Sequence, residues 1–164
     1  MPILTDYTAF AGRHYETGTV HNALAYQGIR APHTNEPYSE ALLMGISGGA
    51  AFGYFTFHYN GLDPQLNLIT RNTFDPLDTL LDRLAIPHEA LGTGSAKAAE
   101  KNLLEALANG QPAIVWASVP TLPYSTPAYA DFDHYMLPIL VYGHGDGTVH
   151  IADRAGVPFT ATAE

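Results

Sequence analysis

The sequence contains no cysteine among its 164 residues. Disulfide bonds, thiolate metal sites and cysteine catalysis are therefore excluded for this chain. Positive charge is also scarce, because seven Lys and Arg stand against 16 Asp and Glu and give a formal net charge of −9. Since phosphate binding requires clustered cations, we expect no nucleic-acid partner, and an anionic membrane surface is disfavoured for the same reason.

Long hydrophobic runs are missing as well. No apolar stretch is long enough to span a bilayer, and the N-terminus lacks the basic region and apolar core of a signal peptide. We therefore expect a cytoplasmic protein that does not associate with a membrane. A hydrophobic content of 46% over 164 residues is typical of a globular chain, and this length predicts a single domain over residues 1–164.

Metal and phosphate motifs are absent too. The eight His residues form no H-x-x-x-H or H-E-x-x-H pattern, so a metal hydrolase is disfavoured. The Gly-rich stretch over residues 45–55 is followed by no GK[ST] and contains no G-x-G-x-x-G, so it is not a phosphate loop. We expect neither a metal nor a cofactor.

What is present begins with residues 12–28, which start as a polar loop and end as a helix. Apolar residues at helical spacing predict a helix over residues 17–27. Thr17 or Thr19 could cap its start, and Gly28 suits a left-handed stop. This stretch is the one around which we expect the chain to be organised.

Tyr15 stands at the start of this predicted helix, between His14 and Glu16. A helix N-terminus gathers unpaired N–H groups and partial positive charge. That is where an activated nucleophile or a bound anion would lie. The local residues also fit an ordinary surface loop that leads into a helix, and both interpretations stay open at this point.

The remaining pattern predicts helices that come first and a largely antiparallel sheet with an inserted helix, which is an α+β architecture. Further helices are expected over residues 39–44, 75–84 and 96–109. Strands are expected over residues 52–59, 65–70, 86–91, 112–118, 134–142 and 148–152. We also expect a long loop over residues 119–133 and a hairpin turn over residues 143–147.

The same pattern predicts which apolar side chains form the core. The expected buried residues are Leu24, Phe52, Leu103, Leu107, Val115, Leu137, Leu140 and Ile151.

His134 opens one predicted strand, and Asp153 ends the next strand along the chain. An antiparallel hairpin brings such ends near each other. A carboxylate beside an imidazole fixes its tautomer, as in a catalytic triad. The glycines of the turn permit bulges, so the register stays open. The alternative is a polar strand terminus and an Asp that caps a turn.

Several segments together resemble one family. They are His14-Tyr15-Glu16-Thr17, Tyr38 to Ile46, Gly48 to Phe55, His134, and Ile151-Ala152-Asp153. The family is the N-terminal domain of butirosin biosynthesis protein H, which is similar to papain-like cysteine peptidases, including the bacteriocin-processing peptidases. The resemblance covers nearly the whole chain. It implies a papain-like α+β fold, in which N-terminal helices pack on an antiparallel sheet.

The resemblance also implies a chemistry. The family pattern has a Cys at the helix start, a His at the head of a sheet strand and an Asp on the next strand. Its best-known activity transfers an acyl group from a carrier protein to an aminoglycoside amine. An acyl carrier protein or a small-molecule amine is therefore an expected partner. Members often carry a further helical region after this domain, so the chain could be the N-terminal part of a longer protein.

This chain departs from the pattern at the nucleophile. Tyr15 aligns with the family Cys, whereas His134 and Asp153 match the other two triad positions. A phenol, with a pKa of about 10, is a poor replacement for a thiol of about 8.5. The departure leaves three explanations: a natural pseudoenzyme, an altered chemistry or an engineered substitution.

We expect an acyltransferase- or peptidase-related domain with catalytic positions Tyr15, His134 and Asp153. Loss of the family's thiol mechanism is the expectation that we favour. The alternative is a non-catalytic binding or scaffolding module that uses the acyl-binding cleft implied by the resemblance.

Overall fold

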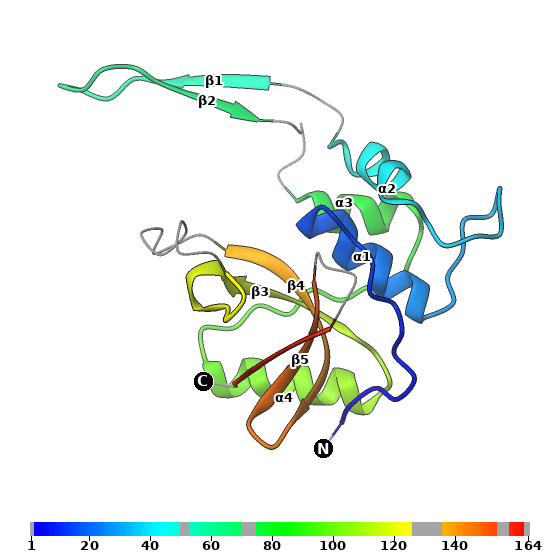
Figure 1. Cartoon of the computed structure of the whole chain (residues 1–164). Helices are drawn as coiled ribbons and strands as arrows, with labels where there is room; N and C mark the ends of the chain where they lie inside the picture. Colours follow the sequence, from blue (N-terminus) through cyan, green and yellow to red (C-terminus); the bar gives the residue numbers. More distant parts are fainter. Residues whose placement is uncertain (1, 50–52, 70–74, 126–135, 154–157, 163–164) are drawn as a thin grey trace. The chain divides into compact units, whose positions relative to one another are not determined.

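The computed structural model describes residues 2–49, 53–69, 75–125, 136–153 and 158–162 (Figure 1). The chain divides into two compact units. The first contains residues 1–40 and 89–164, and the second contains residues 41–88. The described part is a mixed helix and sheet structure, with four α-helices and two antiparallel sheets. It agrees with the predicted α+β class.

The first unit is built on a four-stranded antiparallel sheet. Its strands lie in the order β3-β4-β5-β6. They span Ala113–Ser118, Met136–Gly145, Thr148–Ala152 and Phe159–Thr162, with a short 3₁₀ helix η1 at Val119–Thr121. Helices α1, Tyr15–Tyr26, and α4, Ala96–Ala108, both pack against β3 and β4.

The turn between β4 and β5 is shorter than predicted. Only Asp146 and Gly147 form it, with φ angles of 53° and 71°. Two successive positive φ angles match the right-handed twist of the flanking strands. Gly143 and Gly145 lie inside β4, and the pairing with β5 shifts between Val141 and Gly143, as at a β-bulge. The bulge that the glycines permitted is present.

The predicted core is largely confirmed in the first unit. Five of the expected residues are buried, at 5% exposure or less: Leu24, Leu107, Leu137, Leu140 and Ile151. Leu103 and Val115 are only half-buried, so this prediction is wrong for them, because both line an open groove beside the sheet. Phe52 lies outside the described residues.

An N-terminal segment that the sequence pattern did not predict completes this core. The N–H of Leu4 donates to the carbonyl of Tyr142 at 2.9 Å. Tyr7 is buried and stacks on Tyr142, with ring centroids 4.5 Å apart and an interplanar angle of 11°. Burial, followed by the neighbouring Tyr142 and Tyr26, raises the pKa of the Tyr7 phenol far above its usual range. The segment therefore closes the end of the core beside β4.

The second unit contains α2, Glu40–Ser47, whose first residue closes the first unit, and α3, Pro76–Arg83. Between them β1, Gly53–Phe57, pairs antiparallel with β2, Gln65–Ile69. Both helices and both strands agree with the sequence pattern. The predicted strand over residues 86–91 does not form. Pro87 cannot donate a ladder hydrogen bond, and this segment pairs with no strand among the described residues.

Candidate active site at the start of the first helix

Helix α1 begins at Tyr15, two residues earlier than predicted. His14 is its N-cap, and its ring Nδ1 accepts a hydrogen bond from the Glu16 N–H at 3.3 Å. The His14 and Tyr15 rings stack, with centroids 4.2 Å apart and an interplanar angle of 27°. The half-buried Tyr15 phenol therefore stands at the first position of the helix, beside an imidazole from the cap.

The predicted caps Thr17 and Thr19 are wrong. Both are buried inside the first turns of α1. The Thr19 hydroxyl donates to the Glu16 carbonyl at 2.7 Å, and the Thr17 hydroxyl donates to a Glu40 carboxylate oxygen at 3.2 Å. The helix starts earlier because the His14 ring supplies the acceptor that a Thr hydroxyl was expected to supply.

The Glu40 carboxylate braces the chain just before Tyr15. One of its oxygens accepts from the Arg13 N–H at 2.8 Å, and the other accepts from the His14 N–H at 3.1 Å. With the Thr17 hydroxyl, three donors around the helix start point at a single carboxylate. A negative group at a helix N-terminus is also favoured by the helix dipole. Glu40 therefore fixes the backbone on which Tyr15 stands.

Two further contacts fix the same loop. Gly12 has φ of +144°, and a Cβ there would lie 2.9 Å from Gly18 Cα. Only glycine at both positions allows the loop to lie against the first turn of α1 at this distance. The N–H of Ala11 donates to Oδ1 of Asn22, a fully buried side chain, at 2.8 Å. Residues Ala11 and Gly12, in the loop before Tyr15, are thus both fixed against α1.

Asp153 directly follows β5 and is 3% exposed. Its neighbour Ala152 pairs with Leu140 of β4, so Asp153 lies at the end of the hairpin opposite the Asp146 turn. The chain enters β4 at that same end. His134 lies outside the described residues, two positions before β4 begins. Of the three predicted site residues, the structure therefore describes Tyr15 and Asp153 but not His134.

The sequence pattern missed Glu40, Gly12 and Asn22 as parts of this site. By the sequence pattern, Glu40 falls in the short helix expected over residues 39–44 and has no role at the start of α1. Its partners Arg13 and His14 lie 27 and 26 residues away along the chain. A local pattern carries no signal for such a contact, although the Glu40 segment is one of those that carry the family resemblance.

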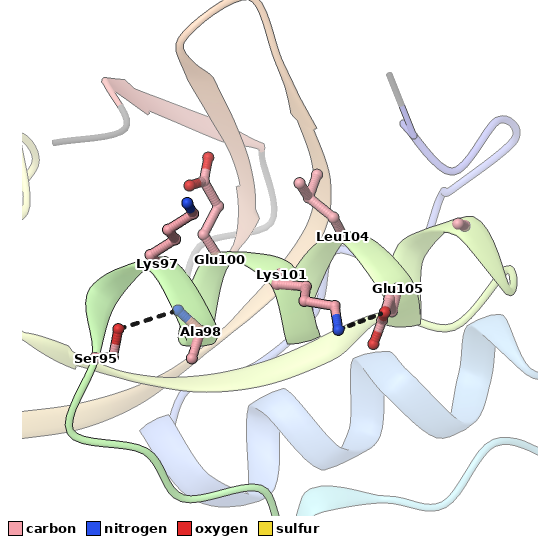
Figure 2. Close-up of a pocket in the computed structure, with 8 residues that line it drawn as sticks. Ser95, Lys97, Ala98, Glu100, Lys101, Leu104 and Glu105 are labelled. Carbon is pink, nitrogen blue, oxygen red and sulfur yellow. Dashed lines mark hydrogen bonds and ion pairs between the residues drawn. The ribbon is translucent and has the colours of Figure 1, made fainter.

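Two hollows elsewhere in the first unit contain neither Tyr15 nor Asp153. The one in Figure 2 lies along α4 and is lined by charged side chains, among them Lys101 and Glu105, whose Nζ and Oε1 atoms are 3.5 Å apart. Both of these side chains are largely exposed, so it is a solvated helix surface. The second is an apolar groove of about 490 Å³ between α4 and the sheet.

Within the described ranges, no three His, Asp or Glu side chains gather as a metal ion would require. The helices in these ranges are also too short or too polar to cross a bilayer.

A helix start braced by a carboxylate, and a buried aspartate at the end of a sheet hairpin, define an α+β protein with a candidate site built on its first helix. The chain belongs to the family described as butirosin biosynthesis protein H, N-terminal, whose profile matches residues 14–154. That range includes all three predicted site positions. No curated protein and no solved structure shows significant similarity to the chain.

Proposed function

We propose that this chain is a papain-like domain related to acyltransferases and peptidases, in which Tyr15 occupies the position of the nucleophile. The observation that carries this proposal is the placement of Tyr15 as the first residue of α1, beside the His14 ring. Membership of the butirosin biosynthesis protein H family supports it. In that arrangement the thiol mechanism of the family is lost, because a phenol replaces the thiol.

The proposed site has three parts. Asp153 accepts a hydrogen bond from the imidazole of His134 and so fixes its tautomer. The other ring nitrogen of His134 faces the position that a thiol sulfur would occupy. Tyr15 fills that position with an aromatic ring whose ionisation requires a much higher pH than that of a thiol. An acyl carrier protein or a small-molecule amine is the proposed partner, and it would bind at the acyl-binding cleft that the family resemblance implies.

The second candidate is a non-catalytic binding or scaffolding module. The stacking of Tyr15 on His14 favours it, because contact between the two rings holds the Tyr15 phenol at the helix start as part of one surface that a ligand could contact. The Glu40 brace would hold that surface in place for a ligand as well as it would hold a nucleophile.

Restoring the thiol tests the first proposal. Since the chain contains no cysteine, Tyr15→Cys gives a protein with one thiol, whose pKa is read from its rate of alkylation by iodoacetamide across pH. A helix N-terminus and an imidazole both favour thiolate, so we expect a pKa well below the usual value of about 8.5. Adding His134→Ala should raise that pKa.

Thr5→Cys is the matched control, because it places the single thiol on an exposed turn residue. We expect its thiol to titrate near the usual value, with or without His134. The proposed triad would be contradicted by a Tyr15→Cys thiol whose pKa equals that of the Thr5→Cys thiol and does not change when His134→Ala is added. That result would favour the binding module.

A further inference from the structure

The chain contains two Asn-Gly pairs, Asn60-Gly61 and Asn109-Gly110, and both asparagines are exposed. Asparagine is chemically labile, most of all before glycine, because glycine has no side chain to shield its backbone nitrogen. That nitrogen attacks the amide carbon of the asparagine side chain and closes a succinimide ring. Since the residue pair and its exposure are the same at both places, the hydrogen bonding around each glycine N–H decides which ring forms.

The first pair lies in the turn that joins β1 to β2. The Leu62 N–H donates to the Tyr59 carbonyl at 3.2 Å and closes a turn around Asn60 and Gly61. Gly61 has φ of 80°, the positive angle that glycine supplies at the third position of a type II turn. Within the described ranges, neither the Gly61 N–H nor the Asn60 side chain forms a hydrogen bond. No such bond therefore hinders attack by the Gly61 nitrogen.

The second pair lies in the C-terminal cap of α4, where Asn109 is the C-cap. The Gly110 N–H donates to the Leu107 carbonyl at 3.0 Å, and the Gln111 N–H donates to the Ala106 carbonyl at 3.0 Å. Attack by the Gly110 nitrogen requires its peptide group to turn out of this cap. That movement breaks the first hydrogen bond and disturbs the second, so the cap protects Asn109.

We propose that Asn60 is a site of spontaneous deamidation, whose isoaspartate product loosens the β1–β2 pair. The Gly61 nitrogen forms a bond to Cγ of Asn60, and the bond from Cγ to the side-chain amide nitrogen breaks. Ammonia leaves with the proton of the Gly61 N–H. Water then adds to either carbonyl of the succinimide ring and gives aspartate or isoaspartate, so the whole reaction consumes only water.

Isoaspartate alters the turn itself. It carries the main chain through the former side chain and so adds a carbon atom to the backbone between residue 60 and Gly61. Each product also adds a negative charge close to Asp63 along the chain. A two-stranded sheet is marginally stable in water, and side chains 54–57 and 65–68 of this one are all exposed. Little packing therefore compensates for a damaged turn.

Incubation of the folded wild-type chain in mildly alkaline buffer tests the proposal, with peptide mass spectrometry to quantify conversion at both asparagines. We expect Asn60 to convert roughly 5–30-fold faster than Asn109, as expected if one or two cap hydrogen bonds must break at the second site. Asn109 is thus the internal control. In the urea-unfolded chain the two rates should become similar, because unfolding removes the cap. Equal rates in the folded chain, or faster conversion of Asn109, would overturn the proposal.

Hydrogen exchange tests the effect on the hairpin. The matched control is Asn60→Gln, aged under the same conditions, because glutamine must close a larger ring and deamidates far more slowly. The amides of residues 53–57 and 65–69 should lose protection in the aged wild-type chain and keep it in the variant. Unchanged protection after isoaspartate has formed at residue 60 would overturn the proposed loosening of the β1–β2 pair.

Discussion

At the scale of the residue, the candidate site depends on a carboxylate outside the proposed triad. Glu40 accepts hydrogen bonds from the Arg13 N–H, the His14 N–H and the Thr17 hydroxyl. Each of these donors lies within two residues of Tyr15. A buried or half-buried donor that loses its acceptor costs more than the hydrogen bond itself contributes. Glu40 should therefore matter to stability as well as to the shape of the site.

We expect Glu40→Ala to lower the free energy of unfolding by about 1–3 kcal/mol, because two backbone N–H groups and a hydroxyl lose their acceptor. Glu40→Gln should lose less, since the amide oxygen still accepts. Urea denaturation monitored by far-UV circular dichroism measures both. Glu89→Ala, which removes an exposed acid from the same unit, is the control. A Glu40→Ala loss no larger than that of the control would show that the brace contributes nothing.

At the scale of the element, α4 shows how one side chain anchors a helix to the sheet. The Ser95 hydroxyl oxygen accepts from the Ala98 N–H at 3.4 Å and caps its start, and Gly110, with φ of 76°, follows its end. Between these limits only Leu107 is fully buried, and it belongs to the core cluster with Ile139 and Val141. The helix therefore docks through a narrow stripe near its C-terminal end.

Leu107→Ala should lower the free energy of unfolding by about 2–5 kcal/mol, because it removes buried contacts and leaves a cavity. Leu104→Ala, on the same helix and only half-buried, is the matched control and should cost clearly less. Urea titration of both variants compares them directly. A Leu107→Ala loss under about 0.5 kcal/mol would show that α4 is not anchored at this residue.

At the scale of the whole molecule, the core belongs to one unit. Every residue of the main hydrophobic cluster lies in the first unit, in residues 1–40 or 89–164. Among its described residues, the second unit, residues 41–88, contributes two fully buried large side chains, Leu43 and Leu80, and the β1–β2 hairpin with its exposed apolar side chains. The energy of apolar burial is thus concentrated in the first unit.

We expect the first unit to fold without the second. A chain in which a flexible Gly/Ser linker of about 15 residues replaces residues 41–88 should unfold cooperatively on heating. Its amide NMR spectrum should keep the dispersion of a folded sheet. Residues 41–88 alone should show neither property. Loss of cooperative unfolding in the linked chain would show that the second unit is needed for the core.

The local pattern of the sequence predicted most of the elements. Periods of 3.6 and 2.0 residues locate α4, β5 and the β1–β2 pair to within a residue or two. These elements are set by contacts between near neighbours along the chain. The exceptions have local causes as well: Pro87 prevents a ladder, and Gly143 and Gly145 continue β4 where a five-residue turn was expected.

The sequence by itself determined the α+β class, the family and the position of Tyr15 at a helix start, because each depends on residue order and short-range spacing. Only the tertiary structure decided that His14 caps α1, that Glu40 braces it and that Gly12 lies against Gly18. The carboxylate lies 23 to 27 residues along the chain from its donors, and the two glycines meet only where the loop folds back on the first turn of α1. Which residue caps α1 depends on where the helix starts, and His14, Thr17 and Thr19 offer three starting points within about one turn. Long-range geometry settles these alternatives, because each hydrogen bond contributes only about 1 kcal/mol, whereas packing of the helix against the sheet contributes far more.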